Sequence, residues 1–193
     1  MTFPGEGVDS AGFDDDRIIL EQILGGEKEL FRLVVKRYEP AIHGMGLGFF
    51  RNEEDALDFT QEVFLKVFRG LNSFEGRSRF STWLFKIAYN TAINSVKRKK
   101  DYKSLADDDV VPDMDTPERK TLRKIIKEAV LESVNDLPER FRICVDLFFF
   151  YERSHEEIEM ITGYPVNTIK SHVFRAKKLL RSKLEDYIEG GIE

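Results

Sequence analysis

Side chains suited to contacting DNA lie along one predicted helix face in TGYPVNTIKSHVFRAKKLLRSK, residues 162–183. This run holds six cations and no acid, although the chain as a whole has 35 Asp+Glu against 30 Lys+Arg. At about 100° per residue, one side of the helix is apolar and the other is polar. Hydroxyls, amides and cations bind base edges and phosphates in a major groove, and an exposed ring can contact a thymine methyl. The apolar stripe is Val166, Ile169, Val173, Ala176 and Leu180, and the polar face is Asn167, Thr168, Ser171, Phe174, Arg175 and Lys178.

The segment before this helix carries the signals of a helix-turn-helix unit. Ser154 and Glu157 have the spacing of a capping box, which starts a helix. Gly163 supplies a left-handed residue to end that helix, and Pro165 suits the first position of the next one. Ordinary αα-hairpins share this pattern. His155 in HEEIE lacks the second histidine that a zinc-binding helix needs, so we predict no metal site.

A second nucleic-acid face is predicted in NSFEGRSRFSTWLFKIAYNTAINSVKRKK, residues 72–100. Its first ten residues form a polar loop with an aromatic residue near each end. Rings interleaved with cations hold unpaired bases by stacking and track phosphates by charge. Burial of Trp83 in the core is the alternative interpretation. The loop contributes Asn72, Phe74, Arg77, Arg79 and Phe80, and the helix contributes Trp83, Lys86, Asn90, Asn94, Lys97 and Arg98.

A third face is acidic and lies on the predicted helix in EEDALDFTQEVFLKVFRGL, residues 53–71. An exposed leucine ringed by carboxylates and an arginine indicates a small surface for a protein partner. An ordinary solvated face is the alternative. The helical projection puts Ala56, Thr60, Val63 and Val67 inward, and Asp58, Gln61, Glu62, Leu65 and Arg69 outward.

Length and hydrophobic pattern predict an all-α chain of two small helical domains. The 193 residues show helical spacing of apolar positions and no long period-2 alternation. We divide the chain into a disordered acidic tail (1–16), a first domain (17–102), a flexible acidic linker (103–118), a second domain (119–187) and a short tail (188–193).

Cysteine usage and hydropathy indicate the cellular compartment in which we expect the protein. The single cysteine, Cys144, lies in the apolar run RICVDLFFF, where we expect it to be buried and inert. We identify no stretch long and apolar enough to cross a membrane and no leader peptide at the N-terminus. We therefore expect a cytoplasmic protein.

The chain resembles an extracytoplasmic-function (ECF) sigma factor of bacterial RNA polymerase. DALDFTQEVFLKVFRGLNSF is similar to the family's region two-point-two, and FSTWLFKIAYNTAINSVKRKK to its regions two-point-three and two-point-four. LPERFRICVDLFFFYERSHEEIEMITGYPVNTIKSHVFRAKKLLR is similar to its region four. The resemblance covers about residues 20–102 and 122–185, nearly everything outside the tails and linker.

That resemblance implies a role for each face. The acidic face would dock on the clamp helices of the polymerase largest subunit. The loop 72–79 would capture a flipped base of the minus-10 promoter element, and Trp83, Asn90 and Asn94 would support strand opening. Lys170, Ser171, Phe174 and Arg175 would enter the major groove at the minus-35 element, with Lys177 and Lys178 near phosphates. The linker would thread through the polymerase toward the RNA exit path, and an anti-sigma factor would be a further partner.

Three features depart from the usual family pattern. GMGLG, residues 44–48, puts three glycines into a predicted helix, which favours a weak or closely packed helix over a phosphate loop. Asn167 and His172 replace a frequent glycine and a frequent arginine, which leaves the groove contacts open.

Two other functions compete with the sigma-factor interpretation. A helix-turn-helix repressor or activator would bind symmetric half-sites without core polymerase. A metal-dependent nuclease would use Glu53, Glu54, Asp55 and Asp58, but successive helix positions point apart and converge poorly on one ion. We therefore expect a non-enzymatic factor without a cofactor, bound to promoter DNA, associated with the nucleoid and not inserted in a membrane.

Overall fold

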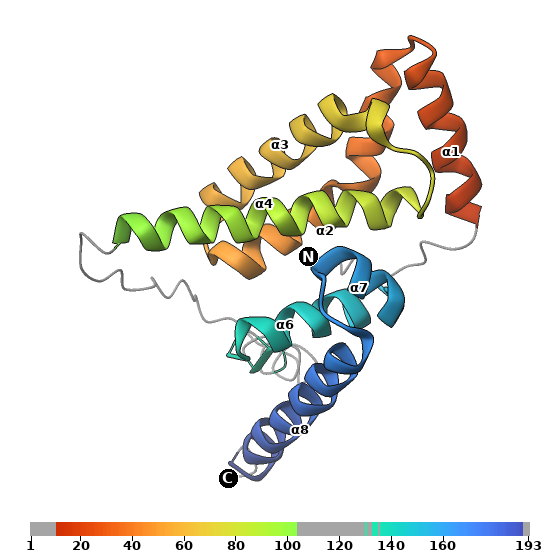
Figure 1. Ribbon diagram of the computed structural model, residues 1–193. Coiled ribbons are helices and arrows are strands. Elements are labelled where there is room, and N and C mark those ends of the chain that lie inside the picture. The colour runs from red at the N-terminus through yellow and green to blue at the C-terminus, as the bar shows by residue number, and fades with distance from the viewer. Residues whose placement is uncertain (1–10, 104–129, 131–132, 135, 191–193) are drawn as a thin grey trace, which may run out of the picture. The chain divides into compact units, whose positions relative to one another are not determined.

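The computed structural model describes residues 11–103, 130, 133–134 and 136–190, and over these residues it is helical without strands. Side chains are described for 16–98, 130, 133–134 and 136–184. Two compact units divide the chain, an N-terminal one with α1–α4 and a C-terminal one with α6 and α8 (Figure 1). The prediction of two all-α domains is confirmed. The predicted linker lies outside the described residues except for Lys103, which ends α4.

Four helices build the N-terminal unit around one core. Helix α2 packs along α3, both contact α4, and α1 contacts α2 and α4 (Figure 1). The fully buried side chains include Val34 and Ile42 of α2, Val63 and Val67 of α3, and Phe85 of α4. The elements are α1 (Ala11–Leu24), a 3-10 turn (Lys28–Leu30), α2 (Phe31–Phe50), α3 (Glu53–Gly70), a second 3-10 turn (Leu71–Ser73) and α4 (Phe80–Lys103).

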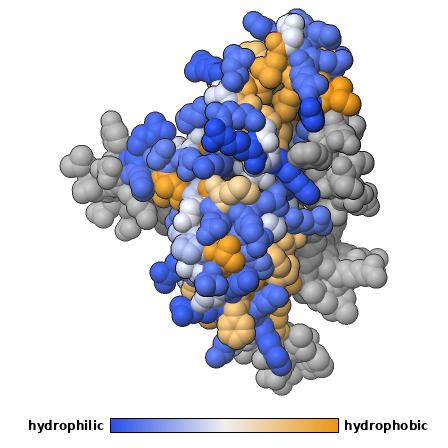
Figure 2. Space-filling model, turned by 45° about the vertical axis from the view of Figure 1, so that its right-hand side comes forward, coloured by the Kyte–Doolittle hydropathy of each residue, from blue (hydrophilic) through white to orange (hydrophobic). Residues whose placement is uncertain are grey.

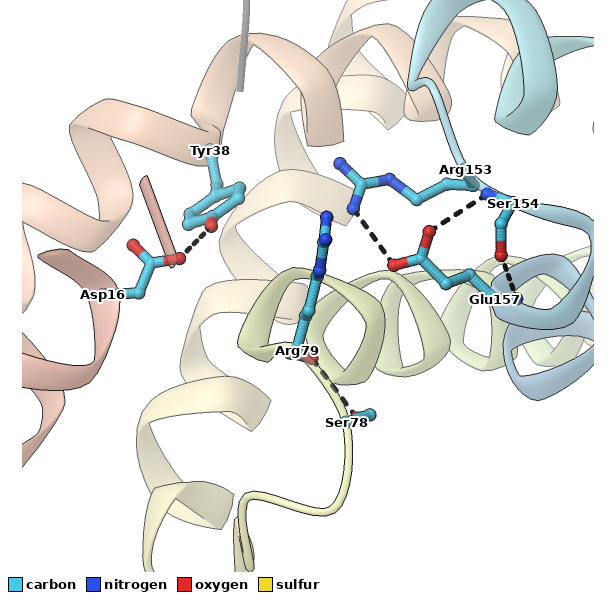
Figure 3. A network of polar contacts seen from close by, with 7 residues as sticks. All are labelled: Asp16, Tyr38, Ser78, Arg79, Arg153, Ser154 and Glu157. Carbon is cyan, nitrogen blue, oxygen red and sulfur yellow. Dashed lines mark hydrogen bonds and ion pairs between the residues drawn. The ribbon is translucent and has the colours of Figure 1, made fainter. Parts of the chain in front are cut away.

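Helix α1 shows that the predicted disordered tail, 1–16, is wrong from residue 11 onward. Asp16 is buried, and its carboxylate accepts a hydrogen bond from the Tyr38 hydroxyl of α2 (Figure 3). It also accepts one from the Arg37 guanidinium of the same helix. A buried carboxylate needs such donors to offset its lost hydration. The acidic composition of residues 14–16 therefore led to a prediction of disorder where the chain forms a helix that Asp16 attaches to α2. Residues 1–10 lie outside the described part.

Helix α3 begins at a strong cap. The Asn52 side chain accepts a hydrogen bond of 2.8 Å from the Asp55 amide, after Arg51 has ended α2 in a left-handed conformation with φ 57°. Glu53, Glu54 and Asp55 fill the first turn, where carboxylates interact favourably with the helix dipole. Three of the four carboxylates considered for a nuclease thus serve the start of a helix. The described residues contain no group of three or more His, Cys, Asp or Glu that could hold a metal ion.

The glycine cluster in α2 marks a close helix crossing. Helix α2 runs unbroken through residues 44–48, and a Cβ added at Gly46 would lie 2.8 Å from Cδ1 of Phe59 and 3.1 Å from Cα of Ala56. Real Cβ atoms do not approach other atoms so closely. The closely packed alternative is therefore confirmed at Gly46, where the missing side chain lets α2 and α3 approach.

The C-terminal unit is built on the packing of α6 (Glu139–Val145) against α8 (Val166–Gly190). After α6, a π-helical turn (Asp146–Phe150) continues the chain. An ion pair of 2.6 Å joins Lys183 of α8 to Asp136, just before α6. The core cluster consists of Leu137, Phe141, Val145 and Ala176, with Leu180 packed against it.

Two boundaries of this part differ from the prediction. Helix α8 continues to Gly190, so the predicted tail, 188–193, is wrong for residues 188–190, and residues 191–193 lie outside the described part. Residues 119–129 of the predicted second domain also lie outside it. Among the described residues, no helix is both long and apolar enough to cross a bilayer.

We expect Gly46→Ala to lower the free energy of unfolding of the N-terminal unit by about 1–3 kcal/mol, because the new methyl group overpacks the crossing. This loss should exceed the gain in helix propensity, which is up to about 1 kcal/mol. Trp83 is the chain's single tryptophan and lies in this unit, so its fluorescence during denaturant unfolding gives the measurement.

Gly70→Ala is the matched control, because a Cβ there meets the Trp83 ring at an ordinary 3.7 Å. We expect it to change the free energy of unfolding by no more than about 1 kcal/mol. Equal losses in the two variants would contradict the close crossing at Gly46.

Candidate nucleic-acid and protein interfaces

The two predicted faces of α8 are confirmed by burial. Ile169, Val173 and Ala176 are buried, whereas the Phe174 side chain is 70% exposed. Phe174 is the most exposed large hydrophobic side chain among the described residues, and it lies among cations and hydroxyls suited to DNA. At this exposure Phe174 does not fill a gap between the described helices of this unit. The other members of the face divide into exposed Asn167, Lys170, Arg175 and Lys178 and half-buried Thr168 and Ser171.

The turn before α8 is fixed by local hydrogen bonds. The predicted capping box is present: the Glu157 amide donates to Ser154 Oγ at 3.1 Å, and the Ser154 amide donates to Glu157 Oε2 at 3.0 Å (Figure 3). Buried Arg153 lies 3.7 Å from Glu157. Helix α7 (His155–Thr162) ends at Gly163, whose φ is 76°. Helix α8 begins at Val166, one residue later than Pro165 alone predicts.

His172 connects α8 to its neighbours, which sequence reasoning did not foresee. Its ring centroid lies 5.1 Å from that of Phe141 in α6 and 5.6 Å from that of Tyr164 in the turn. Its Nδ1 lies 3.7 Å from Cys144 Sγ. Burial, and then the charges of Arg140 and Arg175, lower the pKa of His172 below its usual value. The imidazole therefore acts as a neutral packing group at the base of the exposed face.

Cys144 behaves as the sequence predicts. The side chain is fully buried, and burial raises the pKa of its thiol to about 12. Because the thiolate is the reactive form, this cysteine is inert while the domain is folded.

Helix α4 carries the second predicted face in a single row. Lys86, Asn90, Asn94, Lys97 and Arg98 are exposed, on the side away from buried Leu84, Ala88 and Ala92. Successive members three or four positions apart stack along one side of a helix. The row runs toward the C-terminal end of α4, where the chain is most basic.

Trp83 begins this row and also belongs to an aromatic cluster. Its ring is half-buried and lies 5.3 Å from Phe74 and 5.8 Å from Phe80, centroid to centroid. Phe80 in turn lies 5.8 Å from Tyr38 in the core. The ring is therefore anchored by core aromatics, as the core interpretation predicts, yet part of it stays accessible.

The loop from Asn72 to Arg79 holds its polar side chains outward. Asn72, Arg77 and Arg79 are exposed and Phe74 is half-buried. Gly76 has φ 69°, which lets the chain reverse between two charged residues, and Arg77 pairs with Glu75 at 2.5 Å. The loop therefore offers amide and cationic groups beside the Phe74–Trp83 aromatic pair.

The acidic face of α3 adjoins a groove that the sequence analysis missed. Asp58, Gln61, Leu65 and Arg69 are exposed and Glu62 is half-exposed, as predicted. Gln61 and Leu65 also line a groove of about 520 Å³. Figure 2 shows small apolar patches in a mainly hydrophilic surface on one face of the molecule. The remaining lining residues are Lys28, Phe31, Arg32, Val35, Phe64 and Phe68.

The spacing of residues in the sequence could have predicted part of this groove. Phe68 follows Leu65 by three positions and Gln61 by seven, so it shares their side of α3. It is partly exposed, and its ring contacts that of Phe31 at 5.0 Å between centroids. The contribution of Phe31 depends on the pairing of two distant segments, which no local pattern reveals.

Comparisons with known proteins identify the family of the chain. The family model for Sigma-70 region 2 matches residues 34–102, and that for Sigma-70 region 4 matches residues 127–180. The RNA polymerase sigma-H factor of Pseudomonas aeruginosa is 32% identical over 183 residues, covering 89% of this chain and 95% of the relative. The ECF RNA polymerase sigma-E factor of Escherichia coli is 30% identical over 184 residues, with 90% and 96% covered.

Solved structures share the fold. One is the sigma factor RpoE in complex with the anti-sigma factor NepR from Bartonella quintana, with a TM-score of 0.65, 23% identity, and 80% of this chain and 96% of that chain covered. Another is CnrH in complex with the cytosolic domain of CnrY, with a TM-score of 0.64, 21% identity, and 88% and 97% covered. With the two matched regions and the full-length relatives, these findings establish that the chain belongs to the ECF family of RNA polymerase sigma factors.

Proposed function

We propose that this sigma factor recognises a two-part promoter with α8 and α4 while α3 holds core polymerase. The observation that carries this proposal is the exposed Phe174 among cations and hydroxyls on a helix that follows a capped helix and a glycine turn. A solvated helix gains nothing from exposing that ring. A helix that enters a groove gains an apolar contact there.

The α8 face is suited to duplex DNA at the minus-35 element. Lys170, Ser171, Phe174 and Arg175 lie where a helix inserted by its N-terminal half meets base edges. Arg175 can bind a guanine in bidentate fashion, and Lys178 with Lys177 can neutralise phosphates. His172 supports the face from beneath through Phe141 and Tyr164.

The α4 row and the loop 72–79 are suited to an unpaired strand at the minus-10 element. A base leaving the stack can be received by the loop, whose Asn72, Arg77 and Arg79 offer hydrogen bonds. The accessible part of Trp83 provides a stacking surface, and Asn90, Asn94, Lys97 and Arg98 follow the backbone beyond it. Stacking contributes on the order of 1–3 kcal/mol per base.

The α3 face together with its groove is suited to core polymerase. Asp58, Gln61, Glu62 and Arg69 provide a charged rim, while Leu65 and Phe68 provide the apolar centre that protein interfaces use. The clamp helices of the largest subunit are the partner that the family resemblance implies. An anti-sigma factor is a further partner, in line with the complexes in which similar folds have been solved.

In this proposal the chain contributes binding and strand capture, and the polymerase performs the phosphodiester chemistry. No cofactor or metal ion is required of the chain. The site of action is the cytoplasmic nucleoid, where promoter DNA and core polymerase meet.

In vitro transcription with purified core polymerase on a pool of randomised promoters tests the function directly. We expect transcripts to start downstream of one shared two-part sequence only when the chain is added. A helix-turn-helix repressor would give the opposite pattern: tight binding to symmetric duplex half-sites by the chain alone and no new start sites.

Arg175→Ala should weaken binding of the holoenzyme to the minus-35 element by about 1–3 kcal/mol, because a base-edge contact is lost. Core association should not change. Electrophoretic mobility shifts with promoter fragments measure the first quantity, and co-purification measures the second.

Arg181→Ala is the matched control. Arg181 lies on the same helix as Arg175, but it lines a surface pocket of the C-terminal unit together with Phe149 and Leu184 and is not part of the predicted DNA-binding face. We expect its promoter affinity to stay near that of the unaltered chain. Unchanged promoter occupancy by Arg175→Ala would refute the groove assignment.

Charge reversal at both Asp58 and Glu62 to lysine should abolish co-purification with core polymerase, since the rim would then carry the wrong sign for its partner. Glu39→Lys reverses an exposed carboxylate of α2 and should leave core binding intact. Normal retention of core by the double variant would count decisively against the α3 assignment.

A further inference from the structure

Lys66 connects the proposed polymerase-binding face of α3 to helix α4. Its Nζ lies 2.7 Å from Glu62 Oε1 and donates to Thr91 Oγ1 at 3.1 Å. Thr91 is only 2% exposed, so its hydroxyl is held in the packed interior between the helices. The three side chains thus form a continuous path from a buried hydroxyl to a surface carboxylate.

This arrangement restricts Glu62 more than a surface ion pair does. Glu62 and Lys66 are four positions apart with the acid first, the favourable order on a helix. An exposed pair of this kind contributes little to folding, because both long side chains lose freedom when they meet. Here one end of the lysine is already fixed on Thr91, so much of that loss of freedom is incurred on folding rather than on binding a partner.

The geometry also indicates what Glu62 presents to a partner. Lys66 occupies Oε1, and among the described side chains no contact to Oε2 is found. The Thr91 bond keeps the ammonium on the side of α4, where it repels an approaching cation less than a freely moving lysine would. The open oxygen is therefore suited to a guanidinium or ammonium group of the partner.

We propose that Lys66 is a positioning residue which, anchored on Thr91, holds Glu62 in the orientation that binds a cationic group of core polymerase. The proposal rests on the proposed function, in that the α3 face binds core. Lys66 itself does not contact the polymerase and acts only through Glu62.

A double-mutant cycle on the full-length chain tests this role. The dissociation constant for purified core polymerase is measured at low ionic strength for Lys66→Met, Thr91→Val, Glu62→Gln and the two doubles that combine Glu62→Gln with each of the others. We expect Lys66→Met to weaken core binding about 2- to 5-fold and Thr91→Val to weaken it less, as for loss of one surface charge contact. In the Glu62→Gln background neither change should weaken binding further.

Three measurements separate positioning from general damage. Lys36→Met removes an exposed lysine of α2 and should leave core affinity unchanged. Thermal unfolding should show that every variant is folded at the temperature of the binding measurement, and the loss caused by Lys66→Met should fade as salt screens the partner's charge.

The outcomes that overturn the proposal differ from those that overturn the proposed function. Equal losses from Lys66→Met with and without Glu62→Gln would show that Lys66 acts independently, and an unchanged affinity would show that it does not act at all. If Glu62→Gln alone has no effect while promoter-specific transcription persists, only the assignment of Glu62 fails. If the unaltered chain neither binds core nor directs transcription, the proposed function fails as well.

Discussion

The close crossing of α2 and α3 at Gly46 is the constraint on which the N-terminal unit depends. Because Gly46 has no side chain, Phe59 and Ala56 of α3 can lie directly against the backbone of α2. The inner stripes of the two helices are then buried together, and α4 packs on both. The crossing therefore decides which side of α3 and which side of α4 is left exposed.

Faces of single helices were predictable, because they follow from helical geometry alone. The inward positions of α3, the buried stripe of α8 and the exposed row of α4 were all predicted from apolar residues recurring every three or four positions. The capping box at Ser154 and the glycine at 163 were equally local signals, and both are present. The residues that the family resemblance names lie on these same faces.

Features that join distant segments were not predictable from local patterns. Asp16 seemed to belong to a disordered acidic tail, because its partners Arg37 and Tyr38 lie more than twenty residues away. The groove beside Leu65 needs Phe31, and the packing of His172 needs Phe141, so neither site exists within one helix. Helix ends were also placed imprecisely: α8 extends further than the periodicity suggested, and the π-helical turn after α6 has no sequence signal that we recognised.

The anchoring of α1 has a practical consequence for anyone who wishes to study the N-terminal unit by itself. A chain trimmed to begin at Arg17 would discard the carboxylate that accepts from Arg37 and Tyr38, together with the first turn and a half of α1. Without this acceptor, the Tyr38 hydroxyl and the Arg37 guanidinium lose a hydrogen-bond partner, which lowers the free energy of unfolding. A fragment designed to contain only the N-terminal unit should therefore begin upstream of Ala11, so that α1 remains complete and packed on its own unit.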